Sequence, residues 1–391
     1  MEDNLRRHAT GDGQVRHTVL GNGAQALKCA QVFNGESIQQ YIAVLVQDGR
    51  VIGLVASTDV PSHFNVHHLN HALLAPAYID IQIYGAHKKL FATYPTTESL
   101  SLLHHYCLHG GATMHLPTVA TNSAQVVERC IKAVRDYWAG GGEGVYGLHL
   151  EGPWINPLRR GAHVQSWITK LSLDDARNLV RTGKDVVKMI TLAPECCPAD
   201  VIRYLQDEGI IISAGHTNAS FEEATTAFNQ GINAVTHLYN AMSPLQHRAP
   251  GVVGAALLHP QVAASVIPDG HHVSWEAVRI AKQMMGNRLF CITDAVTETN
   301  KGPYQHYLAA DKYECNGTLS GSALTMHQCV TNLVTHAGVT LEEALRMCSL
   351  YPATVLGLHP QRGRIAAGCY AHFVVLHNGL LEEVISGPLQ K

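Results

Sequence analysis

Short apolar runs that each end at a polar residue recur through the middle of the chain, and amphipathic segments separate them. The runs are Ala77–Asp80, Val145–Glu151, Val187–Glu195, Ile210–His216, Ala234–His237, Ala263–Asp269 and Leu289–Asp294. Helices are predicted at Leu173–Arg181, Trp275–Met285 and Leu341–Ser349, and from Ser220, which forms a capping-box pattern with Glu223. This alternation predicts parallel strands, and about eight of them predict an α/β fold of the (β/α)8 TIM-barrel type. A doubly wound open sheet is the alternative, but no G-x-G-x-x-G motif follows the first strand.

Both ends of the chain show a different, strand-rich pattern. Strands are predicted at Ala26–Phe33, Ile42–Gln47 and Val51–Val55, with a hairpin turn at Asp48-Gly49, and again at His372–Leu376 and Glu383–Ile385. We therefore expect a small β-sandwich domain from residues 25–75 and 359–391, and a barrel from residues 76–358. The polar, Gly-rich residues 1–24 are expected to form a flexible extension.

Composition narrows the possible partners. The chain has 391 residues, 46% of them hydrophobic, and a formal net charge of −3 without a dense Lys/Arg run, which argues against a nucleic-acid partner. No apolar stretch is long enough for a membrane span or a signal peptide. Ten cysteines without framework spacing favour reduced thiols and a cytoplasmic location.

Four polar residues that end predicted strands are candidates for chemistry. His216 and His237 end successive runs, so they are expected on adjacent strands, and Glu151 ends an earlier one. Two imidazoles and a carboxylate form a catalytic metal site when one position stays open for water. Asp294 ends the last run and is placed to act as a general base. Each residue alone could be a hydrogen-bonded rim residue or a helix cap.

The segments around these residues carry a resemblance. In chain order they are His149–Pro153 with Gly161–His163, Gly215–Ala219, Thr236–Pro244, His247–Gly251, Asp269–Val273, Thr293–Ala295 and Leu319–Ser322. They resemble the motifs of the N-acetylglucosamine-6-phosphate deacetylases of the amidohydrolase superfamily, and H-L-E-G-P and T-H-L-Y-N-A-M-S-P are especially specific. The β-rich ends also fit that family.

The resemblance implies roles for individual residues. It implies one divalent metal ion per subunit on Glu151, His216 and His237, with zinc expected first and iron, manganese or cobalt as alternatives. It implies Asp294 as the catalytic acid/base and His272 as a catalytic histidine that contacts the scissile carbonyl. The implied substrate-binding positions are Ala162, His163, Asn240, Ala241, Arg248, Asp269, Gly270, His271, Leu319, Ser320 and Gly321. Arg248 would reach the phosphate in the neighbouring active site of a homodimer.

The implied activity is hydrolysis of the N-acetyl group of N-acetylglucosamine 6-phosphate to glucosamine 6-phosphate and acetate. The alternatives are a deacetylase of another N-acetyl-hexosamine, such as N-acetylgalactosamine 6-phosphate, and, more distantly, a non-catalytic sensor or scaffold. The sequence departs from the pattern in three places. Gln82 and Tyr84 replace the H-x-H pair of many amidohydrolases, Ala249 replaces a Glu, and His372 replaces a common Asp. Gln82 fits a site with one ion, and the role of Tyr84 stays open.

Overall fold

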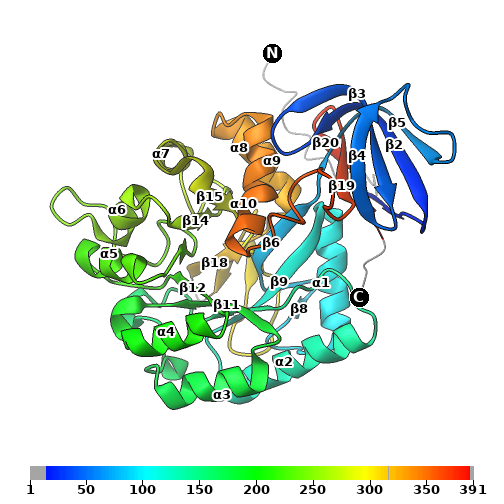
Figure 1. Cartoon of the computed structure of the whole chain (residues 1–391). Coiled ribbons are helices and arrows are strands. Elements are labelled where there is room, and N and C mark those ends of the chain that lie inside the picture. Colours follow the sequence, from blue (N-terminus) through cyan, green and yellow to red (C-terminus); the bar gives the residue numbers. More distant parts are fainter. Residues whose placement is uncertain (1–14, 316, 388–391) are drawn as a thin grey trace.

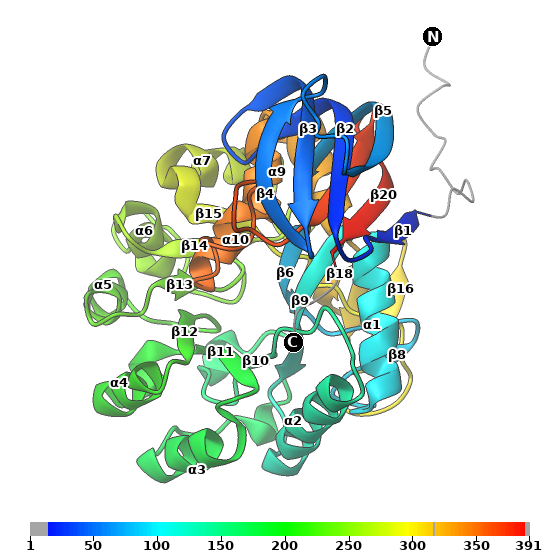
Figure 2. The same cartoon turned by 45° about the vertical axis from the view of Figure 1, so that its right-hand side comes forward.

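The computed structural model describes residues 15–315 and 317–387. A barrel and a sheet built from both ends of the chain make up most of it (Figure 1). The sheet lies against one side of the barrel, beside α8, α9 and the strands β6 and β9 (Figures 1 and 2). The predicted fold class is confirmed.

The barrel has eight parallel strands, which neighbour one another in sequence order from β6 and β9 to β15. They are β6 (Tyr78–Ile83), β9 (Ala112–Ala120), β10 (Leu148–Glu151), β11 (Val187–Leu192), β12 (Ile211–Ala214), β13 (Ala234–Val235), β14 (Ala263–Val266) and β15 (Leu289–Cys291). Just beyond β15, the Asp294 N–H donates to the Gln82 carbonyl at 2.9 Å and the Tyr84 N–H donates to the Ala295 carbonyl at 2.8 Å. These two bonds join the last strand to the first and close the barrel.

Seven of these strands coincide with the predicted apolar runs, and β9 is the one that the pattern does not reveal. Its sequence contains Thr113, His115 and Pro117, which interrupt an apolar run, yet all nine residues lie inside the protein except for the partly exposed Ala120. A strand covered on both faces needs no alternation of polar and apolar residues.

Helices form the outer layer of the barrel (Figure 2). They are α1 (Thr97–His109), α2 (Ala124–Ala139), α3 (Leu173–Gly183), α4 (Ala199–Asp207), α5 (Phe221–Asn229), α6 (Gly251–Leu258), α7 (Trp275–Met285), α8 (Met326–His336), α9 (Leu341–Cys348) and α10 (Leu350–Val355). The predicted capping box is present, because the Ser220 hydroxyl accepts the Glu223 N–H at 3.1 Å and the Glu223 carboxylate accepts the Ser220 N–H at 2.8 Å. All four predicted helices are confirmed.

The two chain ends meet in one seven-stranded sheet, in the order β1-β20-β19-β5-β2-β3-β4. Its strands are β1 (Arg16–Val19), β2 (Ala24–Phe33), β3 (Ile38–Gln47), β4 (Arg50–Ala56), β5 (Asn65–Pro76), β19 (His372–His377) and β20 (Leu380–Ser386). Apolar side chains from β4 at one edge and from β20 near the other, including Val51 and Ile385, share a single buried cluster. The sheet therefore curls around its own core, and the predicted small β unit is confirmed.

The predicted flexible extension needs a correction where the structure describes it. Residues 16–19 form β1, which pairs in parallel with β20, and the Thr18 hydroxyl donates to Glu383 at 2.6 Å. The edge of β20 offers unpaired backbone N–H and C=O groups, and residues 16–19 form a strand by bonding to them although the segment has no apolar periodicity. Residues 1–14 of the predicted extension lie outside the described residues.

An insertion between β15 and α8 adds a three-stranded antiparallel sheet of β16 (Tyr307–Ala309), β17 (Lys312–Cys315) and β18 (Thr318–Ser322). The Ser322 N–H donates to the Asp294 carbonyl at 3.0 Å, which fixes β18 beside the end of β15. A two-stranded pair, β7 (Gly85–Ala86) and β8 (Lys89–Leu90), follows β6. These pieces extend the barrel at the carboxyl ends of its strands.

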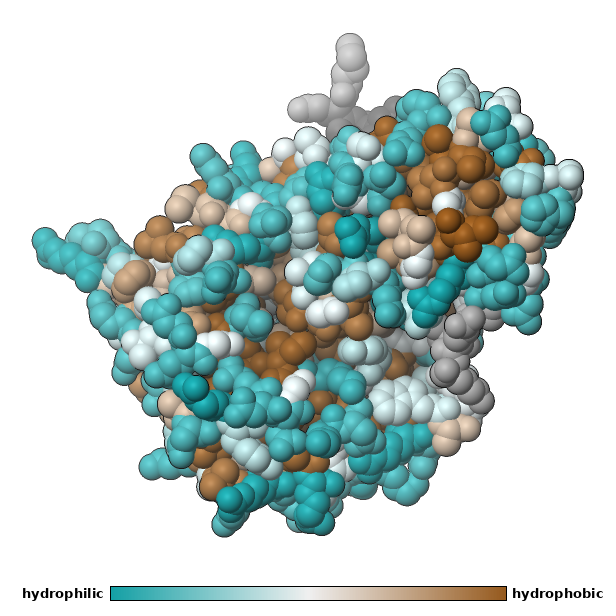
Figure 3. Space-filling model, viewed as in Figure 1, coloured by the Kyte–Doolittle hydropathy of each residue, from teal (hydrophilic) through white to brown (hydrophobic). Residues whose placement is uncertain are grey.

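The surface is mostly polar in the space-filling view, with apolar side chains gathered over the terminal sheet and in a hollow near the centre (Figure 3). Among the described residues, no helix combines the length and apolar character needed to cross a membrane.

Candidate active site

A cavity of about 350 Å³ opens at the carboxyl ends of the barrel strands. Active sites of TIM barrels occupy this end. Most of the predicted site residues line the cavity, namely Glu151, Ala162, His163, His216, His237, Asn240, Ala241, His272, Asp294, Leu319, Ser320 and Gly321. The cavity brings together residues that are far apart in the sequence.

Three of these residues leave their strands in the left-handed backbone conformation. The φ angles are +48° at His216, +37° at His237 and +52° at Asp294. Side-chain-bearing residues adopt this conformation at a cost of the order of 1–3 kcal/mol, and such residues cluster at functional sites. At these positions the chain turns sharply, and the side chains of all three line the cavity.

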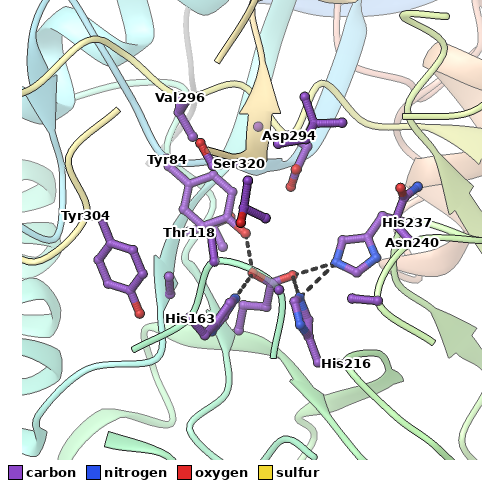
Figure 4. Close-up of a pocket in the computed structure, with 18 of the residues that line it drawn as sticks. Tyr84, Thr118, His163, His216, His237, Asn240, Asp294, Val296, Tyr304 and Ser320 are labelled. Atoms are coloured by element: carbon purple, nitrogen blue, oxygen red, sulfur yellow. Dashed lines mark hydrogen bonds and ion pairs between the residues drawn. The ribbon is translucent and has the colours of Figure 1, made fainter. Parts of the chain in front are cut away.

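Glu151, His216 and His237 bring their ligand atoms together at one point. Figure 4 shows the rings of His216 and His237 close together there. The Glu151 Oε1 atom lies 3.0 Å from His237 Nε2 and 3.3 Å from His216 Nε2, and the two Nε2 atoms are 3.1 Å apart. Ligand atoms held ~2.0–2.1 Å from a tetrahedral ion lie roughly 3.3 Å from one another. The observed spacing therefore fits a single divalent cation.

Neighbouring groups orient these ligands for an ion. The Nδ1–H of His216 donates to the Arg159 carbonyl at 2.9 Å, which leaves the lone pair on Nε2 directed at the cluster. The second carboxylate oxygen of Glu151 accepts hydrogen bonds from the Tyr84 hydroxyl at 2.5 Å and from His163 Nε2 at 3.0 Å. Three acceptor atoms thus meet in a buried space, and a cation satisfies all of them.

The carboxylate of Glu151 stays ionised. Burial alone would raise the pKa of Glu151, but the nearby His216 and the side-chain contacts with His163, His216 and His237 hold the pKa well below its usual value. An anionic ligand suits a divalent ion.

Asp294 lies on the other side of the cavity and behaves in the opposite way. Burial and, next, the negative charge of Glu151 raise the pKa of Asp294 well above its usual value. The Gln82 amide donates to Asp294 Oδ1 at 2.7 Å and to Glu151 Oε1 at 3.0 Å, and so bridges the two carboxyl groups. Two carboxyl groups with pKa values pushed apart are typical of an acid/base site.

His272 is positioned by its neighbour Asp269. The His272 Nδ1–H donates to Asp269 Oδ2 at 2.6 Å, and Asp269 Oδ1 accepts the backbone N–H groups of His271 and His272 at 2.9 and 2.8 Å. Burial would raise the pKa of Asp269, but these bonds and the charge of His272 outweigh it and lower the pKa. The ring is therefore fixed through Nδ1, and Nε2 remains available to the cavity.

Comparison with known proteins decides the family. The model of the amidohydrolase family matches residues 76–386. The chain belongs to the amidohydrolase family.

Several relatives of this amidohydrolase are N-acetylglucosamine-6-phosphate deacetylases. The chain is 31% identical to the N-acetylglucosamine-6-phosphate deacetylase of Vibrio furnissii over 90% of its length and 91% of the relative, and 36% identical to the human one over 81% and 83%. A crystal structure of the Pasteurella multocida N-acetylglucosamine-6-phosphate deacetylase superposes with a TM-score of 0.87 at 31% identity, covering 92% of this chain and 96% of that one. The resemblance read from the motifs is confirmed.

Four predicted substrate-binding residues of the amidohydrolase do not line the cavity. Asp269 acts behind His272, Gly270 packs near Trp275, and His271 pairs with Asp311 at 2.9 Å. Arg248 lies on an exposed turn, in which Gln246 and Ala249 exchange backbone hydrogen bonds at 3.1 and 3.2 Å. Direct substrate contact by these four residues stays a prediction.

The structure also adds residues to the amidohydrolase site that the sequence did not single out. Arg159, Tyr304 and His306 line the cavity. The Tyr304 hydroxyl donates to the Thr121 carbonyl at 2.6 Å, and His306 Nδ1 lies 2.9 Å from the Ser320 hydroxyl. In the sequence, the position of Arg159 between the motifs His149–Pro153 and Gly161–His163 is the one feature that could have indicated it.

Proposed function

We propose that this amidohydrolase hydrolyses the acetamide of N-acetylglucosamine 6-phosphate to acetate and glucosamine 6-phosphate. The observation that carries the proposal is the convergence of Glu151, His216 and His237 in one cavity with Asp294 across from them. The names of the relatives supply the substrate. The structure of a mutant of the Mycobacterium smegmatis deacetylase in complex with N-acetyl-D-glucosamine-6-phosphate superposes with a TM-score of 0.83 at 28% identity.

Each group of residues in the cavity has its own role in the proposed reaction. Glu151, His216 and His237 would hold a divalent ion, which would supply a polarised water and polarise the acetamide carbonyl. Asp294 accepts the proton of the attacking water and returns it to the amine nitrogen as the C–N bond breaks. Asp269 fixes the His272 ring through Nδ1, so that Nε2 faces the cavity and is placed to stabilise the negative charge that develops on the carbonyl oxygen.

We propose one zinc ion per subunit. Two imidazoles and one carboxylate suit zinc, and they also suit iron, manganese and cobalt, among which geometry and availability decide. The outer oxygen of Glu151 is occupied by Tyr84 and His163, which supports a single ion on the inner oxygen.

We also propose a cytoplasmic homodimer in which Arg248 reaches the phosphate in the neighbouring active site. The exposed position of Arg248, outside its own cavity, supports a role toward a second subunit. All ten cysteines are free thiols, which fits a reducing compartment.

Replacing Asp294 with Asn tests the proposal. The amide cannot accept and return the proton, so kcat for acetate release should fall about 10³-fold while the bound metal stays at the wild-type level. The exposed Asp174 on α3 gives a matched control as Asp174→Asn. Full turnover in Asp294→Asn would remove Asp294 from the mechanism.

Measuring the wild type on both epimers checks the substrate. A relative from Escherichia coli O157:H7, 31% identical over 84% of this chain, is named N-acetylgalactosamine-6-phosphate deacetylase. A higher kcat/KM for the galactosamine epimer would favour that alternative.

A further inference from the structure

The cavity has a single strong cation from its own chain. Among the described residues that line it, Arg159 is the only one with a guanidinium or ammonium group. A phosphate carries about two negative charges at neutral pH and is recognised by charge-assisted, often bidentate hydrogen bonds. Arg248, the cation that the family resemblance supplies, lies outside this cavity.

The loop that carries Arg159 begins at the proposed metal ligand Glu151 and ends at a residue that contacts the same carboxylate. It leaves β10 directly after Glu151 and returns at His163, whose Nε2 contacts Glu151 Oε2 at 3.0 Å. A 3₁₀ turn, η1 (Pro157–Arg159), is capped by the Asn156 side chain, which accepts the Leu158 N–H at 2.9 Å. The loop is therefore held close to the reacting centre by its own contacts.

Arg159 is fixed at two points within this loop. Its carbonyl accepts the Nδ1–H of His216 at 2.9 Å, and its Nε–H donates to Asn218 Oδ1 at 2.9 Å. Its two Nη atoms make no hydrogen bond or ion pair within residues 15–315 and 317–387. A guanidinium that is oriented through Nε and free at both Nη atoms is prepared for a bidentate anion.

The neighbours of Arg159 place it beside the predicted sugar positions. Asn218 follows Thr217, whose backbone N–H donates to the Ala241 carbonyl at 3.1 Å. Asn240 and Ala241 line the same cavity as Arg159. The guanidinium thus lies beside the segment that the family resemblance assigns to the substrate.

We propose that Arg159 contacts the substrate phosphate from within the same subunit and makes the cavity selective for phosphorylated sugars. The inference rests on the proposed function, and it adds a cation that is independent of any second subunit. The simpler interpretation is structural, in which Arg159 serves only to hold Asn218 and His216.

Replacing Arg159 with Met separates these interpretations, because Met keeps much of the side-chain length and loses the charge. KM for N-acetylglucosamine 6-phosphate should rise at least about tenfold with little change in kcat, whereas kcat/KM for plain N-acetylglucosamine should stay unchanged. Arg159→Lys should recover part of the loss, since a point charge remains without the bidentate fork. Arg177, which is exposed on α3 and pairs with Asp174 at 3.8 Å, provides the control Arg177→Met.

A purely structural role predicts a different result. Loss of metal from Arg159→Met, or an equal loss on the phosphorylated and plain sugars, would overturn the assignment. Unchanged kinetics on both sugars would overturn it as well.

Binding of glucose 6-phosphate, which has no acetamide, keeps this test independent of the proposed reaction. In calorimetry, the wild type should bind glucose 6-phosphate more tightly than glucose, and Arg159→Met should lose that preference. If the wild type shows this preference and releases no acetate from any sugar, the proposed function fails and the phosphate site stands. If the wild type releases acetate and shows no preference for the phosphate, or keeps the preference in Arg159→Met, the phosphate site fails alone.

Discussion

In the cluster of Glu151, His216 and His237, each side chain contacts the other two, and Glu151 and His216 are also held by other parts of the same chain. Arg248, on the turn of residues 246–249, makes no side-chain hydrogen bond or ion pair with any described residue. The cluster is buried, whereas the turn is exposed. The cluster makes its contacts within the chain, whereas the Arg248 side chain has no hydrogen-bond or ion-pair partner among the described residues.

The difference extends to the surroundings of each region. Around Glu151, the side chains of Gln82, Tyr84 and His163 satisfy both carboxylate oxygens. Around Arg248, the turn closes on itself through the backbones of Gln246 and Ala249 and offers the guanidinium no carboxylate. We infer that the chemical step depends on contacts within the chain, and that part of the phosphate recognition depends on a neighbour.

The largest effect is expected when the cluster itself is broken. In His216→Ala, the cavity loses one of three ligands, so metal content should fall well below one ion per chain and kcat should fall at least about 10³-fold. Elemental analysis and acetate release measure the two effects. The exposed His68 offers the control His68→Ala, and a variant of His216 that kept both metal and turnover would contradict the ligand assignment.

Arg248→Met tests the exposed turn. We expect it to lower kcat/KM for the phosphorylated sugar roughly 10- to 100-fold, because the loss of a charge-assisted hydrogen-bonded pair costs ~1.5–3 kcal/mol. Its metal content should stay at the wild-type level, because the turn touches no ligand. The effect on plain N-acetylglucosamine should be small, since that sugar carries no phosphate.

Mixing variants shows which subunit Arg248 serves. If it acts on the neighbour, equal amounts of Arg248→Met and Asp294→Asn chains form mixed dimers in which one site is complete, and roughly a quarter of the wild-type activity returns. If Arg248 acts within its own subunit, or the protein is a monomer, neither chain holds a complete site and no activity returns.

The two regions also differ in what the sequence could reveal. Glu151, His216, His237 and Asp294 could be predicted because each ends an apolar run, and carboxyl ends of barrel strands meet at one face. The strand β9 could not, because Thr113, His115 and Pro117 interrupt its apolar run, although the strand is buried nearly throughout. The pattern therefore predicted the barrel from seven strands and left the eighth unlocated.

The side-chain contacts that surround the cluster could not be predicted from the sequence, because they join residues that are far apart along the chain. Gln82 reaches Glu151 and Asp294 across 69 and 212 positions, and no local spacing records such a contact. Tyr304 and His306 come from an insertion without helical or strand periodicity, and they reach the cavity only because β18 is fixed to the end of β15. The Tyr84 hydroxyl donates to Glu151 across 67 positions, which no local spacing in the sequence records either.

Tyr84→Phe measures how much those supporting contacts contribute. The hydroxyl donates to the outer oxygen of Glu151 at 2.5 Å, so its loss should weaken metal binding about tenfold, as for other groups that orient a ligand. At saturating metal, kcat should recover most of its value. Competition with a chelator gives the affinity, and the exposed Tyr307 supplies the control Tyr307→Phe. Unchanged affinity would show that the cluster needs no support from Tyr84.

A third region, the junction of the terminal sheet with the barrel, contains a buried histidine. His372 on β19 has two buried ring nitrogens without a hydrogen-bond partner among the described residues. Burial and, next, the charge of Arg362 lower the pKa of His372 to about 3. In the unfolded chain the same group titrates near ~6.5. Below that pH the unfolded state binds a proton at His372, whereas the folded state stays unprotonated there until the pH approaches 3. The free energy of unfolding therefore has its full contribution from His372 above pH ~6.5 and loses it as the pH falls toward 3.

His372→Phe should remove the pH-dependent contribution of His372 to the free energy of unfolding. Its effect on function should be the smallest of these variants, because phenylalanine keeps a ring, cannot titrate and lies outside the cavity at this position. Between pH 7 and pH 5, the free energy of unfolding of the wild type should fall by ~2 kcal/mol more than that of the variant, at ~1.4 kcal/mol per pH unit below pH ~6.5. Urea titrations at pH 7, 6 and 5 measure the difference, and the exposed His68, replaced in His68→Asn, should behave as the wild type does. Equal pH slopes in His372→Phe and the wild type would show that His372 is not what makes the junction acid-sensitive. Because the cluster and Arg248 lie away from this junction, acetate release at pH 7 should be the same in all three proteins.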